Sequence, residues 1–177
     1  MPRKLKTEEL KRLSVNDFKS TPKTPIVIVL DDIRSAYNVG SVFRTADAFL
    51  IEAIYLCGFT PCPPNREIQK TALGANETVQ WKYSENITKV LQELKNSGYK
   101  IAVVEQTDNS VFLNDFSINN REKLAVVFGN EVGGVNQLAI EIADVCIEIP
   151  QFGTKHSLNI AVCAGIVLWE LFPKIKK

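Results

Sequence analysis

Apolar positions along the chain follow two spacings, one typical of strands and one typical of helices. Short runs rich in β-branched residues predict buried strands at 25–30, 53–57, 100–104, 124–128 and 144–149. Apolar residues three or four positions apart predict helices at 42–50, 87–94, 136–143 and 157–172. The last helix is apolar on most sides, so it needs cover from the core or from a partner subunit.

Strands that alternate with helices predict an α/β fold, with a mostly parallel sheet and helices on both of its faces. Ligands in such folds gather beyond the carboxyl ends of the strands. The loops 31–40, 129–135 and 150–157 leave those ends, and they are the richest in glycine and small polar residues. We therefore expect a functional site where these three loops meet.

The beginning of the chain has a different pattern. Over residues 1–24 we expect one or two short helices, for which Thr7 and Ser14 are candidate caps. The apolar side chains that these helices would bury are Leu5, Leu10, Leu13 and Phe18. We predict a helical extension over 1–24 and a single α/β domain over 25–177.

The composition fits a globular protein of the cytoplasm. Apolar residues make up 45% and charged residues 23% of the 177 positions, which allows a sizeable core. No apolar stretch follows the first charges, and the longest apolar run, 160–169, is shorter than the roughly 20 residues that cross a bilayer. The net charge of +1 neither favours nor excludes a nucleic-acid partner. Basic residues near both ends are explained by solvation alone.

The cysteines do not have the spacing of a metal site. No two of the four form a C-x-x-C pair, and His156 is the only histidine. Cys57, Cys146 and Cys163 stand in apolar runs, where a free cysteine usually packs as a small core residue. We expect neither a metal ion nor a disulfide.

The first loop leads into N-V-G-S-V-F-R-T-A at 38–46. If the helix begins near Gly40, Ser41 and Arg44 share a face whose small neighbours leave room for a bulky ligand. Free N–H groups at a helix start also favour phosphate. An Asn38 cap and an ordinary surface arginine explain the same residues equally well.

The second loop, G-N-E-V-G-G-V at 129–135, directly follows a predicted strand. Its glycines allow the backbone to approach a ligand closely, and Glu131 is either a ligand-facing carboxylate or a polar loop residue. The spacing matches neither the dinucleotide fingerprint nor a Walker A loop.

The third loop, I-P-Q-F-G-T-K-H-S-L-N at 149–159, places His156 beside Ser157. Adjacent residues rarely converge as a hydrolase triad requires, and the chain has no G-x-S-x-G elbow. Ser157 is instead expected to cap the last helix, with Asn159 in its first turn.

Taken together, the three segments resemble the SpoU (TrmH) family of RNA 2′-O-ribose methyltransferases, of the SPOUT class. The motifs N-x-G-S-x-x-R-T-A, G-x-E-x-x-G and I-P…S-L-N stand in the family's order, and the resemblance covers about 25–172. Two positions depart from the common pattern. Gln151-Phe152 stands where many members have a methionine, and Ile160-Ala161 follows S-L-N in place of valine and serine.

The resemblance implies a deep C-terminal trefoil knot, which pattern reading alone argues against because knots are nearly absent among proteins. It implies that residues 25–177 form a catalytic domain that binds S-adenosylmethionine in a bent shape. It also implies a homodimer, which would cover the apolar last helix. The implied cofactor residues are Gly129, Ile149 and Leu158, through backbone groups, with Phe128, Asn130 and Gly133 beside them.

The resemblance also assigns roles to polar residues. Arg44 would activate the ribose hydroxyl, while Asn38, Glu131, Ser157 and Asn159 would position the substrate and Arg44. Because arginine rarely releases its proton, we expect Arg44 to steer a phosphate and polarise the hydroxyl, and a phosphate oxygen is a candidate proton acceptor.

The implied partner is RNA. Arg44 and Ser41 are its expected contacts, and the segment 70–75 resembles a family loop on the substrate side, so Arg66 and Lys70 are further candidates. We expect transfer RNA, with ribosomal RNA as the alternative. A catalytically silent RNA-binding member of the fold and an α/β enzyme acting on a small nucleotide remain open as other functions.

Overall fold

The computed structural model describes residues 1–175, apart from the side chain of Thr7, and these residues form a seven-stranded sheet. Its strands are β1 (Thr24–Asp31), β2 (Ile51–Cys57), β3 (Gln80–Ser84), β4 (Lys100–Val104), β5 (Val111–Phe112), β6 (Leu124–Phe128) and β7 (Val145–Glu148). They lie in the order β3-β2-β1-β6-β4-β7-β5, and each neighbouring pair is parallel.

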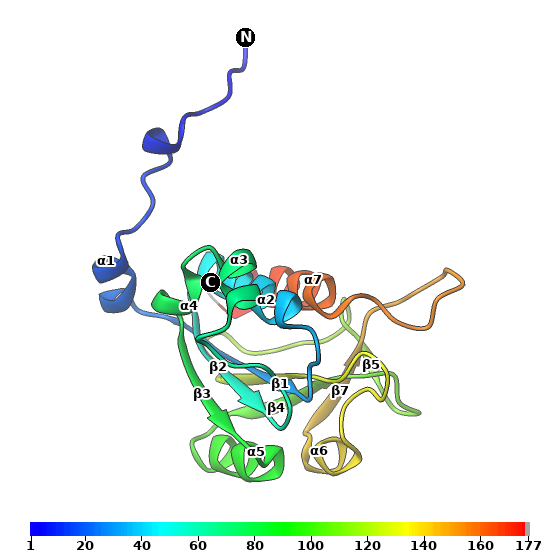
Figure 1. The fold of residues 1–177 in the computed structure, drawn as a ribbon. Helices are drawn as coiled ribbons and strands as arrows, with labels where there is room; N and C mark the ends of the chain where they lie inside the picture. Colours follow the sequence, from blue (N-terminus) through cyan, green and yellow to red (C-terminus); the bar gives the residue numbers. More distant parts are fainter. Residues whose placement is uncertain (176–177) are drawn as a thin grey trace.

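Helices cover both faces of this sheet (Figure 1). On one face lie α2 (Ala36–Ala48), α3 (Arg66–Ala72), α4 (Ala75–Thr78) and α7 (Ile160–Ile175). On the other face lie α5 (Ile87–Asn96) and α6 (Gln137–Ile142). The predicted α/β class, with a parallel sheet between two helical layers, is confirmed. The threading of a knot stays a prediction.

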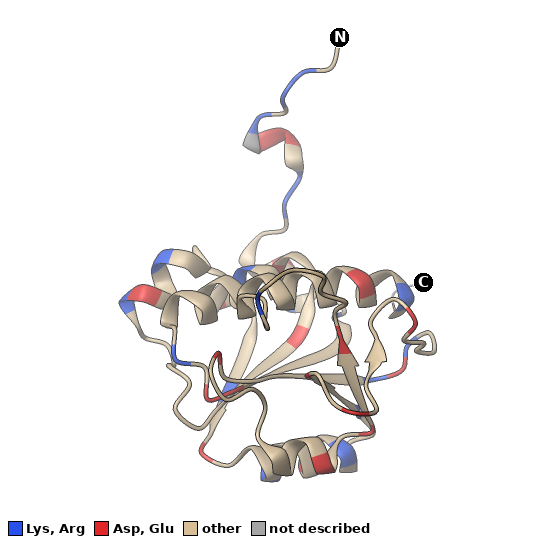
Figure 2. Ribbon diagram, turned by 90° about the vertical axis from the view of Figure 1, so that its right-hand side faces the viewer, with Lys and Arg blue, Asp and Glu red and all other residues tan. Residues whose placement is uncertain are grey.

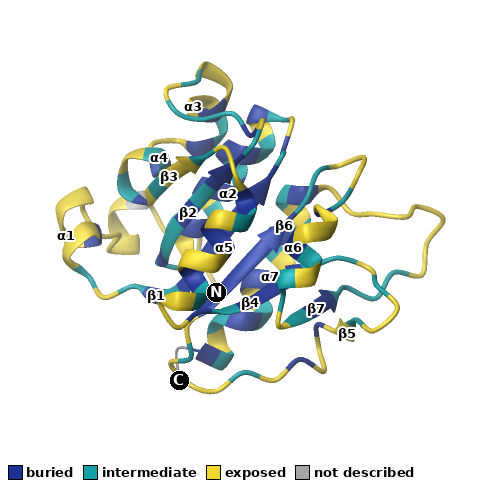
Figure 3. Cartoon of the chain, turned by 90° about the horizontal axis from the view of Figure 1, so that it is seen from below, coloured by how far each residue is buried: buried dark blue, intermediate teal, exposed yellow. Residues whose placement is uncertain are grey.

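The two central strands explain why the sheet needs both layers. In β1, Ile26, Ile28 and Leu30 belong to the core beneath α2 and α7, whereas Val27 and Val29 belong to the core beneath α5 and α6. Every residue of β6 is buried as well (Figure 3). Strands that are apolar on successive positions can be stable only with cover on both faces.

Two strands, β3 and β5, and two helices, α3 and α4, lie outside the predicted elements. β3 is an edge strand with mostly exposed or half-buried residues, and β5 has only two residues, so neither produces an apolar run. Residues 70–72, expected in a loop, end helix α3, which begins after Asn65. The Asn65 side chain accepts hydrogen bonds from the amides of Glu67 and Ile68, at 2.9 and 3.2 Å.

The prediction that the helix after the first loop begins near Gly40 is wrong. Ser35 caps α2 by accepting from the Asn38 amide, so the helix begins at Ala36. Gly40 is buried, and a Cβ there would overlap Thr71 Oγ1 and the Ile68 carbonyl oxygen of α3. Its small size therefore permits helix packing and does not create room for a ligand.

The predicted start of the last helix is also corrected. α7 begins at Ile160, and Asn159 precedes it with its side-chain oxygen accepting from the amides of Ala161 (2.9 Å) and Val162 (3.4 Å). Asn159, and not Ser157, is the cap. An amide side chain serves here because its oxygen reaches the free N–H groups of the first turn.

The first 23 residues project from the body as an arm that carries several basic residues (Figures 1 and 2). It contains a 3₁₀ turn, η1 (Thr7–Leu10), and α1 (Val15–Ser20), which Ser14 caps as predicted. Thr7 is the first residue of the turn, after Lys6 at the cap position. Phe18 is buried as predicted. The prediction that Leu5, Leu10 and Leu13 are also buried is wrong for the single chain, because all three are exposed. The division into an extension and a domain stays a prediction.

Within residues 1–175, no helix combines the length and the apolar character that crossing a bilayer requires. Lys176 and Lys177, the end of the basic C-terminal residues, lie outside the described part.

The contact at Gly40 can be tested with Gly40→Ala. Helix propensity alone would stabilise this variant, but overlap with the α3 backbone should lower the free energy of unfolding by about 1–3 kcal/mol. Denaturant unfolding at one protein concentration measures the change. Ala48→Gly, at an exposed position of the same helix, is the control and should cost up to about 1 kcal/mol. A stabilised Gly40→Ala would contradict the close packing of α2 on α3.

Candidate functional site

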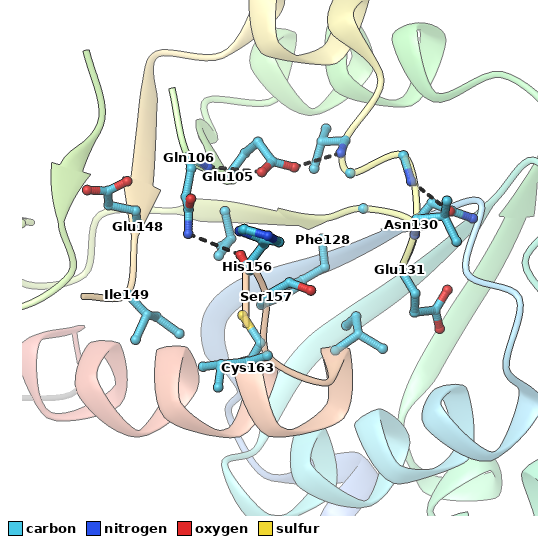
Figure 4. Close-up of a pocket in the computed structure, with 18 of the residues that line it drawn as sticks. Glu105, Gln106, Phe128, Asn130, Glu131, Glu148, Ile149, His156, Ser157 and Cys163 are labelled. Atoms are coloured by element: carbon cyan, nitrogen blue, oxygen red, sulfur yellow. Dashed lines mark hydrogen bonds between the residues drawn. The ribbon is translucent and has the colours of Figure 1, made fainter. Parts of the chain in front are cut away.

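The three glycine-rich and polar loops meet at one edge of the sheet, where the second and third loops line a cavity of about 560 Å³ (Figure 4). The first loop does not line this cavity but contacts the second loop through hydrogen bonds. The three loops follow β1, β6 and β7, which are parallel, so their carboxyl ends lie at the same edge. All six residues predicted for cofactor binding line the cavity: Phe128, Gly129, Asn130, Gly133, Ile149 and Leu158. Glu131 and Ser157 line it too.

The second loop forms one wall as a closed backbone turn. The amide of Asn130 donates to the Gly134 carbonyl oxygen and the amide of Gly134 donates to that of Asn130, both at 2.9 Å. A Cβ on Gly129 would overlap the backbone of Gly134 and Val135. Glycine is therefore required at 129 for the turn to close against the end of β6.

Asn130 uses its side chain to build this turn. Its oxygen accepts from the amides of Val132 (2.8 Å) and Gly133 (3.1 Å), and its nitrogen donates to the Asp32 carbonyl oxygen at 2.7 Å. The residue lines the cavity, but its side-chain atoms already serve to tie the second loop to the first.

Glu105, at the end of β4, holds the same turn from inside the cavity (Figure 4). Its carboxylate accepts from the Val135 amide and from the Gln106 amide, both at 3.0 Å. Gly134 has a φ of 69°, and a Cβ there would overlap the Glu105 carboxylate. One carboxylate thus requires a glycine at 134 and fixes the end of the turn.

Sequence reasoning missed Glu105, Gln106 and Glu148, which all line the cavity. A signal was available, because polar residues that directly follow a buried strand lie at the ligand-binding edge. Glu105 and Gln106 follow the predicted strand 100–104 in this way.

Polar side chains from the three motifs form one chain of hydrogen bonds beside the cavity. The Asn38 amide nitrogen donates to Glu131 at 3.1 Å, and the Asn159 amide nitrogen donates to the Asn38 oxygen at 3.2 Å. The backbone amide of Arg34 donates to the other Glu131 oxygen at 3.3 Å. Residues 93 to 121 positions apart in the sequence are thereby brought together.

Arg44 is exposed on α2, six residues beyond Asn38, and no other described residue forms a hydrogen bond or ion pair with its guanidinium. The Ser41 hydroxyl, one turn before it, donates to the Tyr37 carbonyl oxygen at 2.9 Å. Arg66 and Lys70 are exposed on α3, which packs against α2. The four predicted RNA contacts therefore belong to one helix pair, outside the cavity.

The neighbours His156 and Ser157 both line the cavity, but no hydrogen bond joins their side chains in the described structure. The Gln106 side-chain nitrogen donates a hydrogen bond to the His156 carbonyl oxygen at 3.4 Å, so this contact fixes the His156 backbone and not its imidazole (Figure 4). Burial, together with the charge of Glu105, raises the pKa of the Cys163 thiol to about 12. This thiol is thus an uncharged part of the cavity wall.

Residues 1–175 contain no cluster of three or more histidine, cysteine, aspartate or glutamate side chains placed to hold a metal ion.

The clamp by Glu105 gives a testable prediction. Glu105→Ala removes a hydrogen bond to a charged acceptor, so amide hydrogen exchange of Val135 and of the turn 129–135 should speed up about ten-fold or more. Mass-spectrometric exchange measures it. Glu148→Ala removes a carboxylate of the same cavity that has no side-chain hydrogen bond in the described structure, and it should leave the turn unchanged. Equal effects of both variants would refute the clamp.

Comparison with known proteins finds relatives that are RNA methyltransferases. Residues 25–169 match the model of the SpoU rRNA Methylase family. The chain is 35% identical over 153 residues to the 23S rRNA (guanosine-2′-O-)-methyltransferase RlmB of Neisseria meningitidis, covering 86% of this chain and 60% of that protein. It is 31% identical over 176 residues to an uncharacterized tRNA/rRNA methyltransferase of Borreliella burgdorferi, covering 95% and 76%.

Solved structures of RNA-modifying enzymes have the same fold as this chain. The A. aeolicus TrmH/SpoU tRNA modifying enzyme superimposes with a TM-score of 0.80 at 26% identity, covering 94% of this chain and 82% of that one. An AdoMet-bound rRNA methyltransferase from Sinorhizobium meliloti gives 0.78 at 26% identity, covering 84% and 56%. This chain thus spans less than two thirds of the Neisseria and Sinorhizobium proteins. Because the family model matches most of the chain and relatives share 30% identity or more, the chain belongs to the SpoU rRNA Methylase family.

Proposed function

We propose that this protein transfers a methyl group from S-adenosylmethionine to a ribose 2′-hydroxyl of a structured RNA. One observation carries the proposal. The hydrogen-bonded chain of Asn38, Glu131 and Asn159 adjoins the cavity, so that a donor site and groups able to hold an acceptor stand side by side. A 2′-O-methyltransferase among the relatives and an AdoMet-bound structure among the neighbours support it.

The cavity has features that fit this donor. Phe128, Ile149 and Leu158 supply apolar walls for an adenosyl group, and Gly129 leaves the backbone uncovered where a side chain would intrude. Glu105, Glu131 and Glu148 place carboxylates around a space suited to a cation. Backbone groups of Gly129, Ile149 and Leu158 would hold the adenosyl part.

When bound, S-adenosylmethionine supplies an electrophilic methyl group on a positively charged sulfur. The protein's own task is then to orient and activate the hydroxyl. Asn38 would hold the ribose, and Glu131 and Asn159 fix the Asn38 amide from both of its ends. Ser157 lines the cavity with a hydroxyl that has no partner in the described structure, so it can contact either substrate.

Arg44 would bind a phosphate next to the target ribose, because its guanidinium has no competing carboxylate in the described structure. The positive charge makes the hydroxyl easier to deprotonate, and a phosphate oxygen takes the proton. Ser41, Arg66 and Lys70 would extend this RNA-binding face along α2 and α3.

We propose transfer RNA as the substrate, with ribosomal RNA as the alternative. Similarity to the A. aeolicus tRNA modifying enzyme, with a TM-score of 0.80, supports transfer RNA, and similarity to the Neisseria rRNA enzyme supports the alternative. We also propose that the protein acts in the cytoplasm, where such RNA is found.

The test is to map 2′-O-methyl sites in RNA from cells with and without this protein, and to repeat the transfer in vitro with labelled donor. A site that disappears in vivo and is restored in vitro supports the proposal. RNA binding without transfer would favour a silent binder, and transfer to free nucleosides but not to folded RNA would favour an enzyme of small nucleotides.

We further propose a homodimer that covers α7. Val162, Ile166 and Trp169 follow helical spacing and are exposed in the single chain, Trp169 by 71%. The Trp169 ring also lies against Phe49, with ring centres 6.4 Å apart, so it is held in place. Contiguous exposed apolar surface of this kind marks interaction sites.

Arg44→Ala should lower the rate of methyl transfer at least about 100-fold, because the loss of one electrostatic contact at a reacting centre has an effect of this size. Donor binding, measured by calorimetry with S-adenosylhomocysteine, should remain, since Arg44 does not line the cavity. Arg121→Ala, which removes an exposed arginine at the opposite end of β6, is the control and should keep full activity. Undiminished transfer by Arg44→Ala would remove Arg44 from the mechanism.

Trp169→Asp should convert the dimer into monomers, because it places a charge in an apolar contact. Sedimentation velocity at micromolar concentration measures the oligomeric state. Leu138→Asp makes the same kind of change at an exposed position of α6, on the opposite face of the sheet, and should leave the dimer intact. A wild-type monomer, or a dimer insensitive to Trp169→Asp, would count against this interface.

A further inference from the structure

A second cavity, of about 600 Å³, lies against the turn 129–135 and is not part of the donor site. Asn130, Gly133 and Gly134 line both cavities, so the turn separates them. The other walls of the second cavity come from the ends of β1 and β2 and from the start of α6. Its volume is in the range of sites for small organic groups.

The end of β2 supplies an exposed aromatic ring to this cavity. Phe59 is 88% exposed, although its backbone is fixed, because its amide donates to the Asp32 carboxylate at 2.8 Å. The preceding Gly58 has a φ of 60°, and the Tyr83 hydroxyl donates to its carbonyl oxygen at 3.1 Å. A ring held in water by a rigid turn has the properties of a stacking platform for a nucleobase.

The end of β1 supplies hydrogen-bond acceptors. Asp31 is only 4% exposed, and one of its oxygens accepts from the Asn136 amide at 3.1 Å. Its other oxygen has no partner among the described residues. Every fully buried side-chain oxygen in the described structure has a hydrogen-bond partner. Because this Asp31 oxygen has none, it is not fully buried, and we infer that it faces the cavity that Asp31 lines. Asp32 likewise keeps one oxygen unpaired.

Burial raises the pKa of Asp31, and the charge of Asp32 adds to this, while the hydrogen bond from Asn136 opposes it. A donor from a ligand would relieve this cost. Two neighbouring carboxylates with one arginine, Arg34, make the cavity unfavourable for a phosphate, but they suit a neutral group that presents N–H donors.

Guanine matches these features best among the four bases. Its Watson–Crick edge presents two adjacent donors, N1–H and the N2 amino group, whereas adenine, cytosine and uracil each present only one donor group there. Two carboxylate oxygens therefore accept two hydrogen bonds from guanine alone, while the ring stacks on Phe59.

We propose that the second cavity binds a guanine of the substrate RNA, stacked on Phe59 and hydrogen-bonded to Asp31 and Asp32, within one nucleotide of the methylated ribose. This closeness is part of the proposal, and it is supported by the turn that both cavities share and by Arg34, which lines the second cavity and donates its amide to Glu131 at the first. The inference rests on the proposed function and adds sequence specificity to it.

The full chain tests the cavity without any methyl transfer. The four nucleosides are titrated by NMR in the presence of S-adenosylhomocysteine, which keeps adenosine out of the donor cavity. Guanosine should bind most tightly. Phe59→Ala should lower the affinity for guanosine about ten-fold, as expected for the loss of one stacking contact. Phe112→Ala, which removes a half-exposed ring on β5, should leave this affinity unchanged. Equal binding of all four nucleosides, or no effect of Phe59→Ala, would overturn the proposal.

Asp31→Asn keeps the shape and an acceptor for the Asn136 amide, so it should fold as the wild type, with an unchanged melting temperature. It should reduce the preference for guanosine over cytidine about ten-fold, because an amide offers fewer acceptors. A preference that survives this change would remove Asp31 from recognition.

Mapping of the methylated site separates this proposal from the function on which it rests. If the wild type methylates an RNA position with no guanine at that position or on either side, the guanine site is wrong and the methyltransferase function stands. If no RNA accepts a methyl group, the function fails, and nucleoside binding alone decides whether the cavity recognises guanine.

Discussion

The closure of the turn 129–135 against the end of β6 is the constraint on which both cavities depend. Paired backbone hydrogen bonds between Asn130 and Gly134 define the turn. Glycine is the only residue type that position 129 allows, because any Cβ there would overlap the backbone of the turn. Glu105 holds the turn from one side, through Val135, and Asp32 holds it from the other, through Asn130. If the turn opened, the first cavity would lose a wall, and the second cavity would merge with it.

The same atoms stabilise the fold and shape the site. The Asn159 oxygen caps α7, while its nitrogen donates to Asn38 in the first turn of α2. Ser35 caps α2, and the next turn of the chain supplies Asn38 to Glu131. Helix starts therefore place the polar side chains, so a change that frays α2 or α7 also displaces the groups that would hold a ribose.

Much of this architecture is predictable from the sequence, for identifiable reasons. The central strands β1 and β6 are buried on both faces and so are apolar throughout, which makes them easy to recognise. The three motif loops follow strands, so their convergence follows from a parallel sheet. The edge strand β3 and the two-residue β5 lack such patterns, because edge positions need not be apolar.

Predictions that required tertiary contacts were less successful. From the sequence alone, Gly40 predicts room for a ligand beside α2. In the structure α3 fills that room, and no local sequence pattern predicts that a helix packs there. Glu105 is isolated from the motifs in sequence and joins them only because β4 lies beside β6. Leu5, Leu10 and Leu13 are apolar residues that short helices would be expected to bury, yet they are exposed on the arm.

Charge distribution limits how RNA can be attracted. Residues 1–23 contain seven lysines and arginines against three acidic residues, whereas the remaining residues carry more acidic than basic side chains. The body thus has little long-range attraction for a phosphate backbone, and under the proposed function its contribution would come from local groups such as Arg44, Arg66 and Lys70. A weakly charged body that bound RNA only through phosphates would bind with little selectivity or strength. Specific pairing with a base, in a cavity lined by carboxylates, is therefore the kind of contact that such a surface needs, because it depends on hydrogen bonds and stacking instead of net charge.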